Sequence, residues 1–145
     1  MMMTQDYLSK FYEWIRYVRR TNEKIIRLEQ RRKFHEERWL SIGGPSYDNN
    51  GGHGNDPFYV KGMYDFNQIF EIDKKLDELE KIINDYNEFF DSLDYKLQLI
   101  LTSIMFHEPS MVQVSHKLKI SRTMVYKLKE KMVLTWVEKH DLLNS

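Results

Sequence analysis

The stretch SMVQVSHKLKISRTMVYKLKEK, residues 110–131, decides which fold we expect for the C-terminal part of the chain. Its apolar residues recur at intervals of three and four, the spacing that places side chains on one face of an α-helix. This pattern is interrupted at Lys119 and Ile120, and Ser121 then stands where a helix N-cap belongs, because its hydroxyl can accept a hydrogen bond from a free backbone N–H. The stretch therefore predicts two short helices joined by a tight turn, the arrangement of a helix-turn-helix.

The same periodicity separates buried from exposed positions in the two short helices. The residues expected to be buried are Met111, Val114 and Leu118 in the first helix and Val125, Leu128 and Met132 in the second. The residues expected on the outer side of the second helix are Arg122, Thr123, Tyr126 and Lys127. A polar and basic outer face is typical of a recognition helix that lies in the major groove of DNA, and we expect this helix to span residues 121–138.

Two longer segments, residues 4–40 and 65–91, carry their main apolar residues at alternating intervals of three and four, which is a heptad pattern. The first set is Tyr7, Phe11, Trp14, Val18, Thr21, Ile25 and Leu28. The second set is Ile69, Ile72, Leu76, Leu79, Ile83, Tyr86 and Phe90. Residues 41–64 hold Gly-Gly-Pro, Asn-Asn-Gly-Gly and Asn-Asp-Pro, which are turn signals, and they predict a loop.

We therefore expect an all-α protein in which a long antiparallel helical hairpin, similar to a coiled coil, precedes a small helix-turn-helix domain. The hairpin with its glycine-rich loop would occupy residues 1–92 and serve oligomerisation or partner binding, and the helix-turn-helix domain would occupy residues 93–145. A two-helix hairpin buries little surface. Its remaining apolar residues Leu8, Ile15 and Ile26 therefore predict self-association, most simply as a homodimer.

The formal net charge of zero hides a segregation of charge along the chain. Residues 1–40 carry ten basic and six acidic side chains and residues 65–92 carry three basic and nine acidic ones, so opposite charges favour the pairing of the two long helices. Residues 110–131 carry six basic side chains against one acidic. A phosphate backbone responds to such a local patch rather than to the net charge, so the distribution is compatible with nucleic-acid binding.

Several kinds of protein are not indicated by the sequence. The chain has no Cys, which excludes disulfides and thiolate metal sites and fits a reducing cytoplasm. No apolar run approaches the roughly 20 residues that span a bilayer, so no membrane partner is expected. The His residues lack metal-ligand spacing. The sequence contains neither a recognisable phosphate-binding glycine loop nor a recognisable Ser/His/Asp arrangement. We accordingly expect no enzyme, no metal and no cofactor.

The segment 93–137 resembles region 4 of sigma-70-type factors, in which a leading helix precedes a helix-turn-helix with a basic recognition helix. The positions that match the pattern are Ser115 in the first short helix, Ile120, Ser121 and Arg122 in the turn, and Val125 and Leu128 in the recognition helix. One departure is Lys119, where the family usually has Gly. A left-handed backbone there would cost a non-Gly residue about 1 kcal/mol, so a differently shaped turn is expected.

The whole chain is similar to small late-gene regulators of phages of Gram-positive bacteria, the ArpU and RinA type. Those proteins join an N-terminal helical portion, through a linker rich in Gly and Pro that contains Asp-Pro, to a C-terminal helix-turn-helix like that of sigma region 4. The resemblance implies a transcriptional activator of phage packaging and lysis genes, acting in the cytoplasm of a bacterial host cell. The N-terminal hairpin would then dimerise the protein or hold the host RNA polymerase.

The contacts with double-stranded DNA are expected from the polar residues of the helix-turn-helix. The candidate DNA-binding residues are Ser110, Gln113, Lys119, Ser121, Arg122, Thr123, Tyr126, Lys127, Lys129 and Lys131. Arg122 is the best candidate for a bidentate contact with guanine, and Thr123 or Tyr126 for a thymine methyl group or a phosphate. The lysines are expected to contact phosphates.

Three other interpretations stay open at the level of sequence. The exposed basic face could be an ordinary solvated surface. The chain could be a small terminase subunit, a DNA-packaging protein that also joins a helix-turn-helix to oligomerising helices but usually places it first. It could also be a protein-interaction or anti-sigma module without DNA binding, whose acidic second helix is the working surface.

Overall fold

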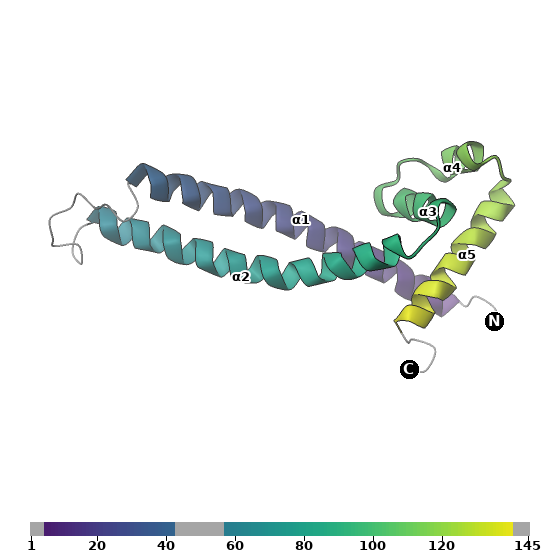
Figure 1. The fold of residues 1–145 in the computed structure, drawn as a ribbon, viewed down its shortest axis with the longest axis horizontal. Helices are drawn as coiled ribbons and strands as arrows, with labels where there is room; N and C mark the ends of the chain where they lie inside the picture. The colour runs from purple at the N-terminus through teal and green to yellow at the C-terminus, as the bar shows by residue number, and fades with distance from the viewer. Residues whose placement is uncertain (1–4, 43–56, 141–145) are drawn as a thin grey trace. The chain divides into compact units, whose positions relative to one another are not determined.

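The computed structural model describes residues 5–42 and 57–140. In this part of the chain it contains five α-helices and no strand (Figure 1). The helices are α1 (Gln5–Ile42), α2 (Pro57–Asp91), α3 (Tyr95–Phe106), α4 (Met111–Leu118) and α5 (Arg122–Lys139). The predicted all-α fold, with a long helical hairpin followed by a helix-turn-helix, is confirmed.

The contacts divide the described residues into two compact units, and both long helices contribute to each of them. Unit 1 comprises residues 5–20 and 83–140, and unit 2 comprises residues 21–42 and 57–82. The sequence pattern places a domain boundary after residue 92. The contacts instead group α3, α4 and α5 with the first turns of α1 and the last turns of α2.

Unit 2 is an antiparallel pair of helical segments, with α1 and α2 side by side (Figure 1). Arg32 Nε donates a hydrogen bond to Asp73 Oδ1 over 2.7 Å. Further along α1, the ring centroid of Trp39 lies 5.5 Å from that of Phe66. Rising residue numbers in α1 thus face falling numbers in α2, which is the register of an antiparallel hairpin.

The seam of unit 2 is partly apolar and partly polar. Ile25, Ile72 and Leu79 are buried, as their heptad positions predict. His35 and Asp65 are also buried, and His35 Nδ1 lies 2.7 Å from Asp65 Oδ1. The heptad register of α1 therefore continues into a hydrogen-bonded polar pair, which fixes how the two helices align in this segment.

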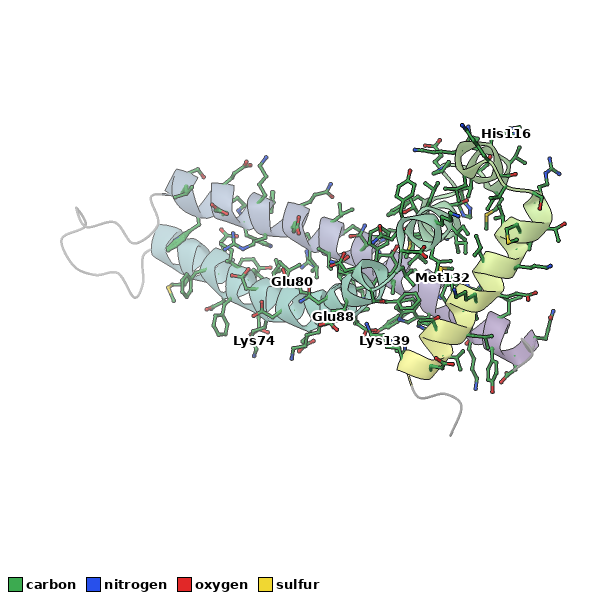
Figure 2. All side chains as sticks on the ribbon, turned by 45° about the vertical axis from the view of Figure 1, so that its right-hand side comes forward. Lys74, Glu80, Glu88, His116, Met132 and Lys139 are labelled. Carbon is green, nitrogen blue, oxygen red and sulfur yellow. The ribbon has the colours of Figure 1, made fainter. Side chains whose placement is uncertain are left out.

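Unit 1 has a core in which aromatic side chains of the long helices meet α5. The Trp14 centroid lies 5.7 Å from that of Phe89 and 5.4 Å from that of Trp136, and Phe11 lies 5.4 Å from Trp136. The core continues among α3, α4 and α5 through fully or nearly fully buried side chains. These are Leu97, Ile100, Leu101, Val114, Val125, Met132, Val133 and Val137. Figure 2 shows Met132 on the inner side of α5.

The predicted loop over residues 41–64 is wrong for its second half, because α2 already begins at Pro57. Proline is favoured in the first turn of a helix, where its fixed φ suits the helical backbone and its missing N–H is not needed. The Asn-Asp-Pro signal therefore marks the start of the helix rather than the middle of a loop. Residues 43–56, which make up the rest of the predicted loop, lie outside the described part of the chain.

The expectation that Ile15 takes part in self-association is also wrong. Ile15 is only 1% exposed, because the first turns of α1 pack within unit 1 rather than ending in a free hairpin surface. Ile26 of unit 2 is 47% exposed and therefore remains a candidate for self-association.

Among the described residues, no helix is long and apolar enough to cross a membrane.

Candidate nucleic-acid interface

The first helix of the helix-turn-helix, α4, begins with two reciprocal hydrogen bonds. The Gln113 backbone N–H donates to Ser110 Oγ over 3.2 Å, and the Ser110 backbone N–H donates to Gln113 Oε1 over 2.8 Å. This capping box satisfies N–H groups that the start of a helix leaves without an intrahelical acceptor. Both predicted contact residues are exposed, and their side chains are held at the front of α4.

The turn between α4 and α5 is closed around Lys119, which has φ 57° and ψ 43°. The expectation of a differently shaped turn is therefore wrong, because Lys119 adopts the left-handed conformation that Gly favours. Ser115 makes two hydrogen bonds across the turn, both to Ile120. Its hydroxyl donates to the Ile120 carbonyl over 2.6 Å, and its own carbonyl accepts from the Ile120 N–H over 3.2 Å. The small residue seen in the sequence thus has a hydrogen-bonding role as well.

The second helix, α5, begins directly after the predicted N-cap. Ser121 has an extended backbone, and its Oγ accepts a hydrogen bond from the Met124 N–H over 3.1 Å. Val125 is only 1% exposed, whereas its neighbours Met124 and Tyr126 are 44% and 51% exposed. The start of α5 therefore turns one edge into the core of unit 1 and leaves the rest of its circumference open.

The open circumference of α5 carries most of the predicted contact residues. The exposed ones are Ser121, Arg122, Thr123, Tyr126, Lys127 and Lys131. Residues 123, 127 and 131 follow one another at intervals of four, and residues 122 and 126 form a neighbouring row, so the set covers one continuous face. Within the described part of the chain, no ion pair involves Arg122, Lys127 or Lys131. Their charges are directed to the surroundings.

Lys129 is the predicted contact residue that the structure places differently. It is half-buried, its Nζ donates to Tyr12 Oη over 3.1 Å, and it lies 5.0 Å from the centroid of the Tyr126 ring. A second ring, that of Tyr12, has its centroid 5.6 Å from the same Nζ. Lys129 thus connects α1 to α5 and lies over the Tyr126 ring, whereas Lys127 is exposed and takes part in no ion pair among the described residues.

An open pocket of about 410 Å³ lies beside Lys129 within unit 1. Its lining residues are Tyr12, Ser103, Ile104, His107, Ser110, Met111, Tyr126 and Lys129. It therefore brings the start of α4 and the middle of α5 to one hollow, whose lining residues include four that carry hydroxyl groups and one that carries an ammonium group. Ser110 and Tyr126, which are separate in the sequence pattern, share this surface.

Two residues of α1 support the interface without being suggested by the sequence pattern. Tyr12 holds Lys129, as described. Arg19 donates from Nε to the Met105 carbonyl over 3.1 Å and from Nη2 to the Ile104 carbonyl over 3.2 Å. Carbonyls in the last turn of a helix lack intrahelical donors, so Arg19 stabilises the end of α3. Heptad spacing identifies apolar seams, and it gives no sign of such polar contacts.

No group of three or more His, Asp or Glu side chains in the described segments could hold a metal ion. Comparison with protein-family models, with curated proteins and with solved structures found no significant match. The function must therefore be argued from this surface alone.

Proposed function

We propose that the chain is a sequence-specific DNA-binding transcriptional regulator that places α5 in the major groove of double-stranded DNA. The observation that carries the proposal is the open, basic start of α5. It follows the turn that Ser121 caps, and α3 and α4 pack against its inner side. A helix with one buried edge and an exposed basic face is what the width of the major groove accommodates.

The side chains divide into two expected roles. Arg122 stands at the first position of α5, and its planar guanidinium can donate two parallel hydrogen bonds to guanine. Thr123 and Tyr126 follow on the same open face and reach a thymine methyl group or a phosphate. Lys127 and Lys131 contact phosphates, which positions the protein without reading sequence.

The start of α4 supplies the remaining contacts of the proposal. Its first backbone N–H groups and the exposed Ser110 and Gln113 side chains attract a phosphate. The charge balance of residues 110–131, six basic side chains against one acidic, supports such contacts with a phosphate backbone. Lys119 and Ser121 stand at the two ends of the turn between α4 and α5, and both lie beside the same DNA strand in the proposed complex.

The biological setting follows from the resemblance to phage late-gene regulators, and it is part of the proposal. The protein would activate packaging and lysis genes in the cytoplasm of a bacterial host. It would act as a homodimer and hold the host RNA polymerase near the promoter. No observation on the structure favours the terminase or the anti-sigma interpretation over this one.

The test is a gel-shift with the full chain on DNA fragments that tile its own genomic neighbourhood, at two salt concentrations. A fragment that stays retarded at the higher salt in the presence of competitor DNA is the expected result, and it identifies the operator. Retardation of every fragment that disappears with salt would reduce the surface to a non-specific basic patch. The absence of binding at both salt concentrations would reject the proposal.

A matched pair of variants separates sequence reading from backbone contact. Arg122→Ala is expected to relax the preference for the operator and to cost about 1–3 kcal/mol of specific binding. Lys127→Ala is expected to weaken binding to operator and competitor alike, and to make the salt dependence shallower by about one unit. Both side chains are exposed on the first two turns of α5, so identical behaviour of the two variants would contradict the division of roles.

A further inference from the structure

Unit 2 has a groove of about 500 Å³ between α1 and α2. Its lining side chains are Lys24, Arg27, Leu28 and Arg31 of α1 and Gln68, Glu71, Ile72 and Lys75 of α2. Residues 24–31 and 68–75 each cover about 10 Å of helix, given the rise of about 1.5 Å per residue. The groove is therefore elongated along the two helices, and each helix supplies one of its sides.

The floor of the groove is apolar. Leu28 is half-buried and Ile72 is buried, and both belong to the heptad seams at which α1 and α2 meet. Two helices cover such a seam only from their own sides, so its edge remains open to a further element. Removing this apolar edge from water would favour an occupant of the groove.

The sides of the groove carry an excess of positive charge. Four of the eight lining side chains are cations and one is a carboxylate. In the described segments, no ion pair involves Lys24, Arg27 or Arg31. The fourth cation, Lys75, has its Nζ 4.0 Å from a carboxylate oxygen of Glu78. The excess charge therefore lies on the α1 side, where nothing in the described part of the chain neutralises it.

Other arginines of α1 do have partners within unit 2. Arg32 donates to Asp73 over 2.7 Å, and Arg38 Nε lies 3.5 Å from Asp65 Oδ2. These two arginines hold α1 and α2 together. By contrast, Arg27 and Arg31 leave their charges available to a molecule outside the hairpin.

The spacing of the cations indicates what kind of molecule fits. Lys24, Arg27 and Arg31 follow one another at intervals of three and four, so they form one row along α1. Carboxylates at the same intervals on a second helix form a row with matching spacing. An apolar stripe beside that row would cover the floor of the groove, as in other complexes in which an amphipathic helix lies in a groove.

Two exposed aromatic side chains extend the groove at one end. Phe34 follows Arg31 by three positions, and Tyr64 precedes Gln68 by four. The ring centroid of His35 lies 5.3 Å from that of Phe34 and 6.0 Å from that of Tyr64, so both aromatics stand at the same end. Phe34 is 54% exposed and Tyr64 is 53% exposed. An occupant longer than the lined stretch would cover them.

We propose that this groove binds an acidic amphipathic helix of another protein. The apolar stripe of that helix packs on Leu28 and Ile72, and its row of carboxylates pairs with Lys24, Arg27 and Arg31. Its end covers the exposed rings of Phe34 and Tyr64.

The lining favours this occupant over two others. A nucleic acid would meet the cations, but it would leave the apolar floor uncovered and would place phosphates beside Glu71. The same face of a second copy would bring an excess of positive charge against another. A helix with both an apolar stripe and a row of carboxylates satisfies the floor and the cations together.

This inference goes beyond the proposed function and does not depend on DNA binding by α5. The residues that carry it all belong to unit 2, whereas the proposed recognition helix belongs to unit 1. The two proposals can therefore fail separately. Binding of an acidic helix without binding of an operator would reject only the proposed function, and the reverse result would reject only the present inference.

The test is fluorescence anisotropy of the full chain with a labelled peptide of about three heptads, at about 0.15 M salt. The peptide carries Leu at positions a and d and Glu at positions e and g, and it is kept dilute so that it remains monomeric. Saturable binding is the expected result. Two control peptides are expected not to bind. One has the same composition in scrambled order, and the other has Lys in place of every Glu.

Charge reversal locates the binding surface. Arg27→Glu with Arg31→Glu is expected to weaken binding of the acidic peptide by about tenfold or more, because attractive contacts become repulsive. The same variant is expected to bind the Lys peptide more tightly than the unaltered chain does. This gain separates loss of the contact from loss of folding.

The matched control is Lys33→Glu with Lys74→Glu, which changes the net charge by the same amount. Both lysines are exposed and neither lines the groove, and Lys74 lies instead over the Phe70 ring at 5.7 Å from its centroid (Figure 2). This variant is expected to bind the acidic peptide within about twofold of the unaltered chain. Equal losses in the two double variants would reduce the effect to net charge and overturn the inference.

Three further outcomes would also overturn it. The first is equal binding of the ordered and scrambled acidic peptides, or no binding of either. The second is binding of a mixed-sequence oligonucleotide that depends on Arg27 and Arg31, without peptide binding, which would assign the groove to nucleic acid. The third is a change in oligomeric state of the Arg27→Glu, Arg31→Glu variant in sedimentation equilibrium, without peptide binding, which would assign the groove to a second copy.

Discussion

The ammonium group of Lys129 in α5 donates a hydrogen bond to the hydroxyl group of Tyr12 in α1 over 3.1 Å, although the two residues stand 117 positions apart in the chain. The same ammonium group lies 5.0 Å from the ring centroid of Tyr126. A lysine on a recognition helix is ordinarily counted among phosphate contacts. Here its position supports α5 from within unit 1 and places the ammonium group against the Tyr126 ring.

Removal of Lys129 is therefore expected to change stability more than the salt dependence of DNA binding. Lys129→Ala loses a charge-assisted hydrogen bond and a cation–π contact and should lower the free energy of unfolding by about 1 kcal/mol. Tyr12→Phe keeps the ring and should cost less. Urea unfolding followed by circular dichroism gives both values. If Lys129→Ala reduced the salt slope of binding as Lys127→Ala does, its role would be that of a phosphate contact after all.

Lys119 offers a gain in stability at the turn. Its φ of 57° places a side chain where the left-handed backbone crowds its Cβ, and Gly has no such cost. Lys119→Gly is expected to raise the free energy of unfolding by about 0.5–1 kcal/mol, which is the strain released less the entropy that Gly loses on folding. Lys119→Ala keeps the Cβ and should show no comparable gain. The measurement is the shift of the urea midpoint, and a loss of stability in the Gly variant would mean that this conformation is not strained.

Val125 tests whether the helix-turn-helix depends on its small core. Val125 is 1% exposed, so Val125→Asp places an unpaired charge in that core and should cost about 3 kcal/mol or more. The control Met124→Asp alters the adjacent residue, which is 44% exposed, and should change stability by about 0.5 kcal/mol at most. Thermal unfolding of both variants checks the contrast. Equal effects would mean that α5 is not oriented with Val125 inward.

Two carboxylates of unit 2 each have a nitrogen of a basic side chain 2.7 Å away, and they differ in burial. Asp65 pairs with His35 and is fully buried, whereas Asp73 pairs with Arg32 and has a side chain that is 47% exposed. Asp65→Ala leaves a buried partner without its carboxylate and should cost about 3–5 kcal/mol, whereas Asp73→Ala should cost about 1 kcal/mol or less. Chemical unfolding measures both. Similar losses in the two variants would show that distance, rather than burial, sets the value of these pairs.

Burial also raises the pKa of Tyr86 to about 12, because the charged phenolate is poorly solvated beside Trp14. In the unfolded chain this phenol loses its proton near pH ~10, so above that pH the unfolded state binds fewer protons than the folded state. Its contribution to stability is complete below pH ~10 and is lost by about 1.4 kcal/mol for each pH unit up to the folded pKa. Tyr86→Phe should lack this component. The measurement is the difference in unfolding free energy between the two proteins from pH ~9 to pH ~12, and a constant difference would contradict the shifted pKa.

The helices themselves could be predicted from local sequence because their signals are local. Ser121 acts as the predicted N-cap, and α5 spans Arg122–Lys139 where the sequence predicts a helix over residues 121–138. Each of these features depends on residues within one or two turns of one another, so spacing and residue type are sufficient. The start of α2 at Pro57 was missed because Pro fits both a loop and a first helical turn.

The roles of polar side chains at the candidate interface needed the structure. The sequence treats Lys127 and Lys129 alike, since both are lysines near the start of α5. Only the position of Tyr12 beside Lys129 distinguishes them. Ser115 was recognised as a small residue, and the hydrogen bond from its hydroxyl to Ile120 became visible only with the turn in place.

Apart from the start of α2, the sequence by itself determined where the described segments are helical and which stripe of each helix is apolar, because helical periodicity depends on residues a few positions apart. The tertiary structure alone decided what covers each stripe. Phe11 and Ile15 are buried within unit 1, where the Phe11 ring meets Trp136 of α5, although the heptad pattern is equally compatible with a free hairpin that includes them. A periodic pattern identifies a face that must be buried, and it carries no information about which distant segment buries it.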